Sequence, residues 1–256
     1  MKVLSLFDGI SCGRVALERS GIPVERYVAY EIEKNAIKIS QKNWPDIEHC
    51  GDVTKADFTQ YQGFDLLIGG SPCTHWSIAK AGRETTSSGI GWELFMQFKR
   101  ALTESGCRYF LYENNWSIHK SIQQEISNQL GVDAVPINSS KFSAQSRKRL
   151  YWTNIVFDTE FSDRGITLQS ILEFGEAKRK KSKTVRVGGS GSGWGNKHEW
   201  DMPNESRVYT TIELERLQTL PDNYTSGVSE AQRRKCIGNG WTVDVIAHIL
   251  KYLPKD

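Results

Sequence analysis

Four side chains of this protein have the types and the order that nucleophilic catalysis requires. Cys73 follows an apolar run and a Gly-Gly-Ser-Pro turn, and Glu113 stands at the end of a second apolar run. Arg147 and Arg149 lie two residues apart, so in an extended segment they point to the same side. A thiolate is a nucleophile, a carboxyl group can hold or donate a proton, and guanidinium groups can stabilise the charge that an addition develops. We therefore predict Cys73 as the nucleophile and the other three as catalytic residues that assist it.

The order of these groups resembles that of the cytosine-5 methyltransferases of DNA, and the resemblance runs nearly from end to end. The matching segments are Phe7-Asp8-Gly9, Pro72-Cys73, Glu113-Asn114, Gln145-Ser146-Arg147-Lys148-Arg149, Arg216-Leu217-Gln218-Thr219 and Ile237-Gly238-Asn239-Gly240-Trp241. Each motif alone is weak, whereas their joint order and spacing are specific. The resemblance implies that the chain methylates carbon 5 of cytosine, with S-adenosyl-L-methionine as the methyl donor.

The resemblance also implies a role for each predicted catalytic residue. The Cys73 thiolate is expected to attack carbon 6 of the cytosine ring, while Glu113 holds or protonates ring nitrogen 3. Carbon 5 of the adduct then takes the methyl group, and loss of its proton with expulsion of the sulfur restores the ring. One or both of Arg147 and Arg149 brace the base carbonyl or the target phosphate. Because the reacting carbon is inaccessible in a duplex, the base must be flipped out.

A strand-to-helix turn at residues 7–13 is the predicted cofactor site. It lacks the G-x-G-x-x-G spacing of a dinucleotide site, and its acidic Asp8 would repel a pyrophosphate but suits the cationic amino-acid end of S-adenosyl-L-methionine. Glu31, at the end of the second predicted strand, is placed to accept both ribose hydroxyls. By resemblance, Asp52 and Val53 contact the adenine, and Trp241 closes the other side of that ring. The predicted cofactor-binding residues are Phe7, Asp8, Gly9, Gly13, Glu31, Ile32, Asp52, Val53, Pro72, Asn239 and Trp241.

Three polar residues, Ser77, Asn114 and Gln145, are predicted to bind the substrate. Ser77 is expected to hold the phosphate of the target nucleotide, and Asn114 to position the loop and the cofactor side. The glycine-bearing loop after the nucleophile is expected to close over DNA as a lid, with residues 78–80 filling the gap left by the flipped base. Asn115 departs from the valine usual in this family motif and puts a polar group near the expected methyl path.

Alternating strand and helix patterns in the first half of the chain position these motifs. The predicted strands cover residues 2–7, 26–30, 66–68 and 108–112, and the predicted helices cover residues 14–19, 34–42, 93–104, 121–130, 210–217 and 242–253. Such alternation predicts an α/β fold with a doubly wound, mainly parallel, Rossmann-like methyltransferase sheet and a small target-recognition insertion. Ligands of such sheets bind beyond the carboxyl ends of the strands, where these motifs lie.

The strand and helix alternation stops after Trp152. The following residues include a basic run at 178–183, a glycine-rich stretch at 187–196, and Trp194 and Trp200. By resemblance this is the target-recognition region, whose small size is similar to that of the animal de novo branch; the alternative is a disordered linker. The predicted organisation is a catalytic and cofactor-binding domain at 1–152, a small target-recognition region at 153–206 and a C-terminal segment completing the catalytic domain at 207–256.

The composition of the 256 residues is typical of a globular protein, with 38% hydrophobic and 25% charged residues. No apolar run approaches the ~18 residues that a membrane helix needs, and the first apolar stretch is too brief for a signal sequence. A cytoplasmic protein without a membrane partner is therefore expected. The five cysteines have no spacing suited to zinc or to a disulfide framework, so no metal is expected.

A net charge of +3 permits a nucleic-acid partner without demanding one. Its distribution is more informative, because basic residues gather at 147–149, 178–183 and 233–235. We predict double-stranded DNA as the partner. Two alternatives stay open at this point: the same chemistry on transfer RNA, and a catalytically inactive DNA-binding homologue. The target sequence, the choice between monomer and homodimer, and a restriction-modification setting are not specified by the sequence.

Overall fold

The structure, a computed structural model, describes residues 1–77, 82–185 and 207–255. The strands in these ranges are β1 (Lys2–Leu6), β2 (Arg26–Tyr30), β3 (Glu48–His49), β4 (Leu66–Gly69), β5 (Tyr109–Asn115), β6 (Val135–Asn138) and β7 (Lys148–Thr153). The α-helices are α1 (Cys12–Arg19), α2 (Lys34–Asn43), α3 (Ile90–Ser105), α4 (Lys120–Leu130), α5 (Thr211–Leu217), α6 (Glu230–Asn239) and α7 (Val243–Leu250).

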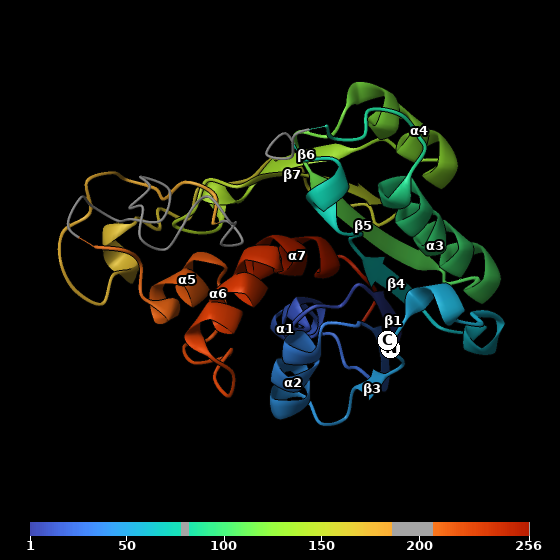
Figure 1. Ribbon diagram of the computed structural model, residues 1–256, viewed down its shortest axis with the longest axis horizontal. Helices are drawn as coiled ribbons and strands as arrows, with labels where there is room; N and C mark the ends of the chain where they lie inside the picture. The colour runs from blue at the N-terminus through green and yellow to red at the C-terminus, as the bar shows by residue number, and fades with distance from the viewer. Residues whose placement is uncertain (78–81, 186–206, 256) are drawn as a thin grey trace.

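The seven strands described form one sheet in the order β3-β2-β1-β4-β5-β7-β6 (Figure 1). The first five strands in this order pair in parallel, whereas β7 runs antiparallel to both β5 and β6. Helices cover both faces: α3 and α4 lie on one side, and α1, α2 and α7 on the other. The prediction of a doubly wound, mainly parallel, Rossmann-like sheet is confirmed.

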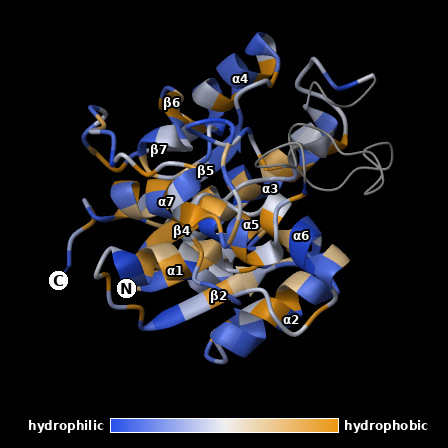
Figure 2. Cartoon of the chain, turned by 90° about the vertical axis from the view of Figure 1, so that its left-hand side faces the viewer, coloured by the Kyte–Doolittle hydropathy of each residue, from blue (hydrophilic) through white to orange (hydrophobic). Residues whose placement is uncertain are grey.

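The sheet separates two apolar cores. One core joins α1 and α7 to the sheet through residues such as Val15 and Ile246, and the other joins α3 and α4 through Phe98 and Ile126. All of β4 is buried, as expected for a strand covered on both faces. In Figure 2, apolar segments coloured orange lie near the centre of the molecule around β4. This packing holds the strand ends, where the predicted motifs lie, in a fixed arrangement.

The C-terminal helix α7 packs against the first helix α1. Arg19 Nη1 lies 2.6 Å from Asp244 Oδ1, and Ser20 Oγ donates to the carbonyl oxygen of Ala247 at 3.0 Å. Apolar side chains of both helices belong to the same core. The segment that leads into α7 is thereby brought to the edge of the sheet beside the turn after β1.

Several elements were not predicted from the sequence. Helix α6 was missed because its buried residues are confined to its C-terminal end, at Cys236, Ile237 and Gly238, so it has no repeating apolar face. Strand β3 has two residues, and the short β6 contains Pro136, which masks a strand pattern. Helix α7 also ends at Leu250, before the predicted limit.

The described part of the predicted target-recognition region, residues 153–185, is largely irregular. A 3-10 turn, η5 (Gln169–Ile171), packs against α5 and α6 in a third apolar core that includes Leu168, Tyr209 and Leu217. A bridge between Gln145 and Ser182 joins this region to the segment before β7. The predicted glycine-rich stretch with Trp194 and Trp200, and the predicted gap-filling residues 78–80, lie outside the described residues.

Candidate active site

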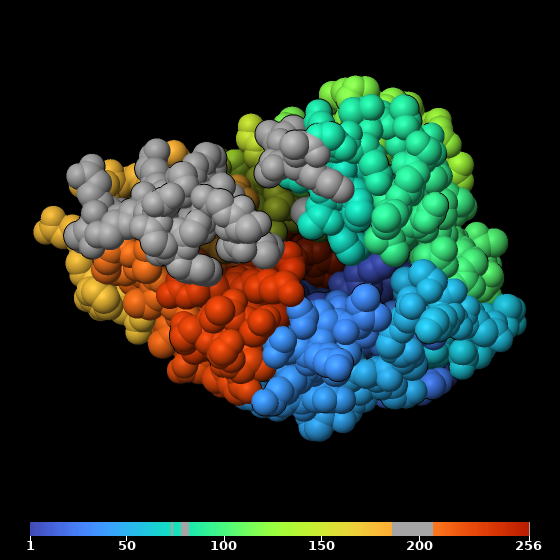
Figure 3. All heavy atoms as spheres, in the orientation of Figure 1, coloured from blue at the N-terminus to red at the C-terminus, as the bar shows by residue number. Residues whose placement is uncertain are grey.

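The carboxyl ends of the five parallel strands face the same edge of the sheet. The surface is hollowed at this edge between the part that carries α3 and the part that carries α5 and α6 (Figure 3). Residues near both ends of the chain are visible at the floor of the hollow. This edge is therefore where the predicted cofactor and catalytic residues meet.

The turn after β1 has an unusual backbone. Phe7, Gly9 and Ser11 have positive φ angles of 56°, 59° and 61°. Left-handed backbone is costly for residues with a Cβ, so the surroundings must hold the turn in place. Asp8 N donates to the carbonyl oxygen of Tyr30 at 3.1 Å, which ties the turn to the end of β2.

The Asp8 carboxylate faces into the protein from this turn. It accepts hydrogen bonds from Ser5 Oγ at 2.6 Å, from Tyr27 OH at 2.7 Å and from Ser11 Oγ. Burial raises the pKa of Asp8, and the three hydroxyl donors partly oppose that rise. Asp8 in this structure stabilises the turn, and its predicted contact with the cationic end of the cofactor stays a prediction.

The Glu31 carboxylate connects the turn to the start of α2. Glu31 Oε2 accepts from Gly9 N, and Oε1 accepts from Ile32 N and Glu33 N, each at 2.8 Å. The Ile32 side chain is 71% exposed directly beside it. Asp52 caps the 3-10 turn η1 (Val53–Lys55) through Thr54 N at 2.9 Å, and Val53 is buried. The predicted ribose and adenine residues thus line neighbouring strand ends.

The predicted nucleophile lies at the end of β4. Cys73 begins the 3-10 turn η3 (Cys73–His75), directly after the exposed Pro72; its side chain lies outside the described part of the structure. The return arm of this loop is held by Glu84, which accepts from Trp76 Nε1 at 3.1 Å and lies 3.4 Å from His75 Nδ1. The backbone of the predicted nucleophile is therefore placed at the same edge as the cofactor turn.

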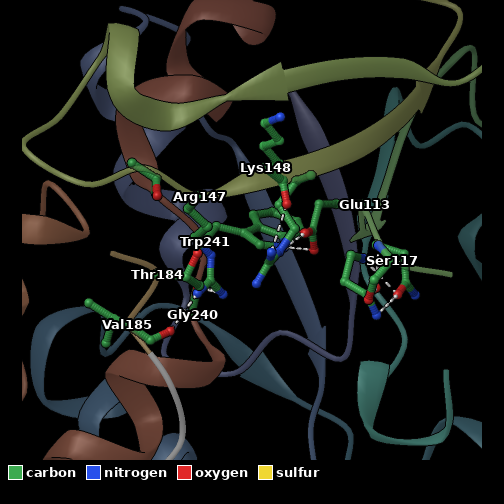
Figure 4. Close-up of polar contacts among 12 residues, drawn as sticks. Glu113, Ser117, Arg147, Lys148, Thr184, Val185, Gly240 and Trp241 are labelled. Carbon is green, nitrogen blue, oxygen red and sulfur yellow. Dashed lines mark hydrogen bonds and ion pairs between the residues drawn. The ribbon is translucent and has the colours of Figure 1, made fainter. Parts of the chain in front are cut away.

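The predicted catalytic carboxylate is held on both of its oxygens (Figure 4). Arg149 Nε lies 3.0 Å from Glu113 Oε1, and Trp241 Nε1 donates to Glu113 Oε2 at 2.9 Å. Glu113 and Arg149 come from paired strands, β5 and β7. Trp241 comes from the segment between α6 and α7, 128 residues farther along the chain.

Gly70 leaves the space that this carboxylate occupies. A Cβ at Gly70 would lie 2.9 Å from the backbone oxygen of Glu113, 3.0 Å from its Oε2 and 3.4 Å from Trp241 Nε1. Gly13 lies on the other side of the indole, where a Cβ would clash with Ile68 Cδ1 at 2.4 Å but would make only ordinary contact with Trp241 Cζ3 at 3.6 Å. Gly70 is therefore the glycine that leaves room for the Glu113 carboxylate.

Arg147 reaches a different target from Arg149. Its buried guanidinium donates to the carbonyl oxygens of Val185 at 2.9 Å, Gly238 at 3.2 Å and Gly240 at 3.2 Å. These contacts fix the backbone directly before Trp241. Arg147 thus holds the backbone next to the indole, and Arg149 pairs with the carboxylate that the indole contacts. A catalytic role for Arg147 stays a prediction.

The predicted substrate residue Gln145 is fully buried. Its amide nitrogen donates to the carbonyl oxygen of Leu217 and to Gln218 Oε1, both at 3.0 Å, and its oxygen accepts from Val185 N at 2.8 Å. Gln218 in turn donates to the carbonyl oxygen of Gly240 at 2.9 Å. Gln218 was not predicted as a site residue, although it stands in a matching family segment.

Asn114 and Asn115 both have internal partners. Asn114 Nδ2 donates to the carbonyl oxygen of Ser71 and to Tyr112 OH, each at 3.2 Å. Asn115 Oδ1 accepts from Ser117 N at 2.9 Å and from Ser117 Oγ at 2.7 Å. The carbonyl oxygen of Ser117 accepts from Arg83 of the loop after the nucleophile. Asn115, the departure from the family pattern, therefore builds the turn on which that loop rests.

The roles predicted for Asn239 and Ser77 stay predictions. Asn239 is exposed at the end of α6, and Ser77 is half-buried just before the residues that are not described. In the basic run, Lys181 Nζ donates to the carbonyl oxygens of Ser140 and Ile166, both at 2.6 Å, and burial lowers its pKa. Lys181 thus anchors the irregular region internally.

Over residues 1–77, 82–185 and 207–255, no group of three or more His, Cys, Asp or Glu side chains is arranged to hold a metal ion. No helix in the same ranges is long and apolar enough to cross a membrane.

Known proteins resemble this chain in sequence. A family model described as C-5 cytosine-specific DNA methylase matches residues 1–187 and 152–255. Orphan methyltransferase M.Rho11sI of Bacillus phage rho11s is 30% identical over 201 residues, which are 73% of this chain and 39% of the phage protein. Type II methyltransferase M.NlaX of Neisseria lactamica is 25% identical over 303 residues, covering 98% of this chain and 96% of that protein. The chain thus spans well under half of the phage relative.

Solved structures share the fold. The Entamoeba histolytica methyltransferase EhMeth has a TM-score of 0.78 at 16% identity, covering 98% of this chain and 97% of that chain. A mutant of Spodoptera frugiperda DNMT2 has a TM-score of 0.72 at 17% identity, with 98% of both chains covered. At such identities the similarity is one of fold. Because the family model covers nearly the whole length, the chain belongs to the family of C-5 cytosine-specific DNA methylases.

Proposed function

We propose that this chain transfers a methyl group from S-adenosyl-L-methionine to carbon 5 of a flipped-out cytosine in DNA, through a covalent adduct of Cys73. The observation that supports this best is the Glu113 carboxylate, held by Arg149 and Trp241 at the sheet edge where the Cys73 turn begins. A carboxyl group in that position can engage ring nitrogen 3 of the base. Family membership supports the same reaction.

The residues at the ends of β1 and β2 fit S-adenosyl-L-methionine. A Cβ at Gly9 would meet nothing within 4 Å, so the backbone there faces open space. The exposed Ile32 offers an apolar surface for an adenine. Glu31 stands beside it, and its three backbone partners leave about one of the four acceptor positions of the carboxylate, on Oε2, for a ribose hydroxyl. When bound, this cofactor supplies a methyl group from a sulfonium, whose sulfur departs readily as a neutral thioether.

The chain's own residues would carry out the remaining steps. The Cys73 thiolate forms a bond to carbon 6 of the base, and Glu113 holds or donates a proton at nitrogen 3, so that carbon 5 becomes nucleophilic. Arg149 keeps the Glu113 carboxylate oriented throughout. After methylation, the proton on carbon 5 passes to water, and its electron pair restores the double bond between carbons 5 and 6. The bond from carbon 6 to sulfur then breaks, which returns the Cys73 thiolate, and Glu113 recovers any proton that it gave to nitrogen 3. Because both new bonds form on the faces of the ring, which neighbouring bases cover in a stacked duplex, the cytosine must leave the duplex first.

The test is methyl transfer from labelled S-adenosyl-L-methionine to random-sequence duplex DNA, with transfer RNA as the competing substrate. We expect label in duplex DNA, and bisulfite sequencing then gives the position and the sequence context. Label in transfer RNA alone would show that transfer RNA, and not DNA, is the substrate. No label in either, despite cofactor binding, would favour an inactive DNA-binding homologue.

The covalent step needs its own experiment. Duplexes containing 5-fluorocytosine should become trapped as a covalent complex, because fluorine cannot leave as the carbon 5 proton does. We expect Cys73→Ser to abolish trapping and methyl transfer while S-adenosyl-L-methionine still binds. Full activity of Cys73→Ser would remove Cys73 from the mechanism.

A further inference from the structure

We propose that Trp241 is a positioning residue for Glu113, acting through its indole N–H. Trp241 Nε1 donates to Glu113 Oε2 at 2.9 Å, whereas the sequence predicted only a contact with the adenine for this residue. The proposal rests on the proposed function, because it assigns a role in that reaction. Figure 4 shows the indole beside the Glu113 carboxylate, on the side toward Arg147.

The residues next to Trp241 are held in place by hydrogen bonds. The carbonyl oxygen of Gly240 accepts from both Arg147 and Gln218, and Thr242 Oγ1 donates to Gln218 Oε1 at 2.8 Å. Backbone contacts therefore fix the residues on both sides of Trp241. A side chain that is anchored in this way can impose its orientation on a partner.

Partners on both oxygens hold the Glu113 carboxylate. Arg149 forms an ion pair with Oε1, and Trp241 donates a hydrogen bond to Oε2. An ionised carboxylate offers about four acceptor positions, so positions remain for donors at ring nitrogen 3 and the neighbouring amino group of a cytosine. Without the indole N–H, the carboxylate keeps only its ion pair with Arg149 and can rotate out of the plane of the base.

The variant that isolates this interaction is Trp241→Phe, which keeps an aromatic ring against Gly13 but removes the donor. A hydrogen bond to a charged group is worth about 10- to 100-fold in rate, so we expect kcat to fall by that factor. KM for S-adenosyl-L-methionine should stay near the wild-type value, because the interaction acts on the reacting base. The rate of trapping by 5-fluorocytosine duplexes should fall with kcat.

Trp44→Phe is the matched control. Trp44 Nε1 donates to Tyr224 OH at 3.0 Å, at a place away from the Glu113 centre, so this variant also loses one indole hydrogen bond. We expect its kcat to equal that of the wild type. Thermal unfolding of both variants checks that they are folded; should Trp241→Phe fail to fold, Trp241→Leu tests the same loss of the donor.

A second arm measures whether Trp241 acts through Glu113. In the Glu113→Gln background, Trp241→Phe should not slow trapping further, because the oriented carboxylate is already absent. Additive losses, or an unchanged kcat for Trp241→Phe, would overturn the proposal. A rise in KM for the cofactor that accounts for the whole defect would make Trp241 a cofactor contact instead. An inactive wild type would overturn the proposed function first, and the positioning role with it.

Discussion

The predicted cofactor side and the predicted catalytic side of the same sheet edge are built in different ways. At the ends of β1 and β2, the acidic groups take their hydrogen bonds from near neighbours in the sequence: Glu31 from Gly9, Ile32 and Glu33, within 22 residues. At the ends of β4 and β5, Glu113 depends on Arg149 and on Trp241, which is 128 residues away. One side is assembled locally and the other by long-range contacts.

This difference predicts different effects of mutation on the two sides. Local hydrogen bonds form as soon as the turn and the adjoining helix form, so they suit a binding surface of constant shape. Contacts between distant segments require the whole domain to be packed, and they make the orientation of Glu113 dependent on parts of the chain far from the reacting base. We therefore expect changes on the catalytic side to lower turnover and changes on the cofactor side to lower affinity.

The largest effect is expected at the carboxylate itself. Glu113→Gln removes the proton-handling group and the ion pair with Arg149, and general acid–base groups contribute about 10²- to 10⁴-fold. We expect kcat for methyl transfer to fall by that factor, with cofactor affinity preserved. Glu48→Gln is the control, because it breaks an exposed ion pair with Arg26 and should leave kcat unchanged. If Glu113→Gln also lost cofactor affinity, the predicted division between turnover on one side and affinity on the other would be wrong.

Glu31→Gln tests the cofactor side. Both oxygens of Glu31 accept backbone N–H groups, so an amide NH₂ in either position faces a donor. We expect the affinity for S-adenosyl-L-methionine, measured by calorimetric titration, to fall about 10- to 100-fold, with a smaller change in kcat. Asp57→Asn, which changes an exposed cap on Thr59, serves as the control. Reduced kcat at saturating cofactor would place Glu31 on the catalytic side.

A pair of glycine variants, one on each side, separates displacement of Glu113 from backbone strain. In Gly70→Ala, the new methyl group would lie 2.9 Å from the backbone oxygen of Glu113 and 3.0 Å from its Oε2, so we expect kcat to fall about tenfold by displacement of Glu113. Gly9→Ala meets no atom within 4 Å but has a φ of +59°, so it should cost about 1–2 kcal/mol of unfolding free energy. Equal kcat losses in the two variants would show that strain, and not displacement, explains both.

The smallest expected effect concerns the chemical reactivity of the buried thiols of Cys12 and Cys236. Burial raises the pKa of Cys12 and of Cys236 to about 12, so few of these thiols are ionised near neutral pH. We expect iodoacetamide to modify the exposed Cys50 of the folded protein well before Cys12 or Cys236, as read by mass spectrometry of peptides. Early modification of Cys12 would mean that the packing around residues 7–13 opens in solution.

The sequence was sufficient for the parts that depend on local patterns. Strands β1, β2 and β4 and helices α1 to α4 follow from apolar periodicity, and Glu31 directly follows β2 as predicted. The strand predicted to end at residue 112 continues to Asn115, so Glu113 lies within β5, two residues before its end. The contact between Trp241 and Glu113 could not be predicted, because no local pattern encodes a hydrogen bond across 128 residues. The contacts of Arg147 were missed for the same reason: spacing placed Arg147 and Arg149 on one side of an extended segment, but only packing of the C-terminal segment decided which one reached the carboxylate.

The position of Trp241 in the chain has a consequence for biosynthesis. A ribosome produces residues 73, 113 and 149 before it reaches residue 241, so a nascent polypeptide contains the nucleophile, the carboxylate and its arginine while the indole is still untranslated. Until residue 241 has emerged, the carboxylate has one partner instead of two. On the proposed role of Trp241, competence to modify DNA would therefore be acquired only after residue 241 has been translated.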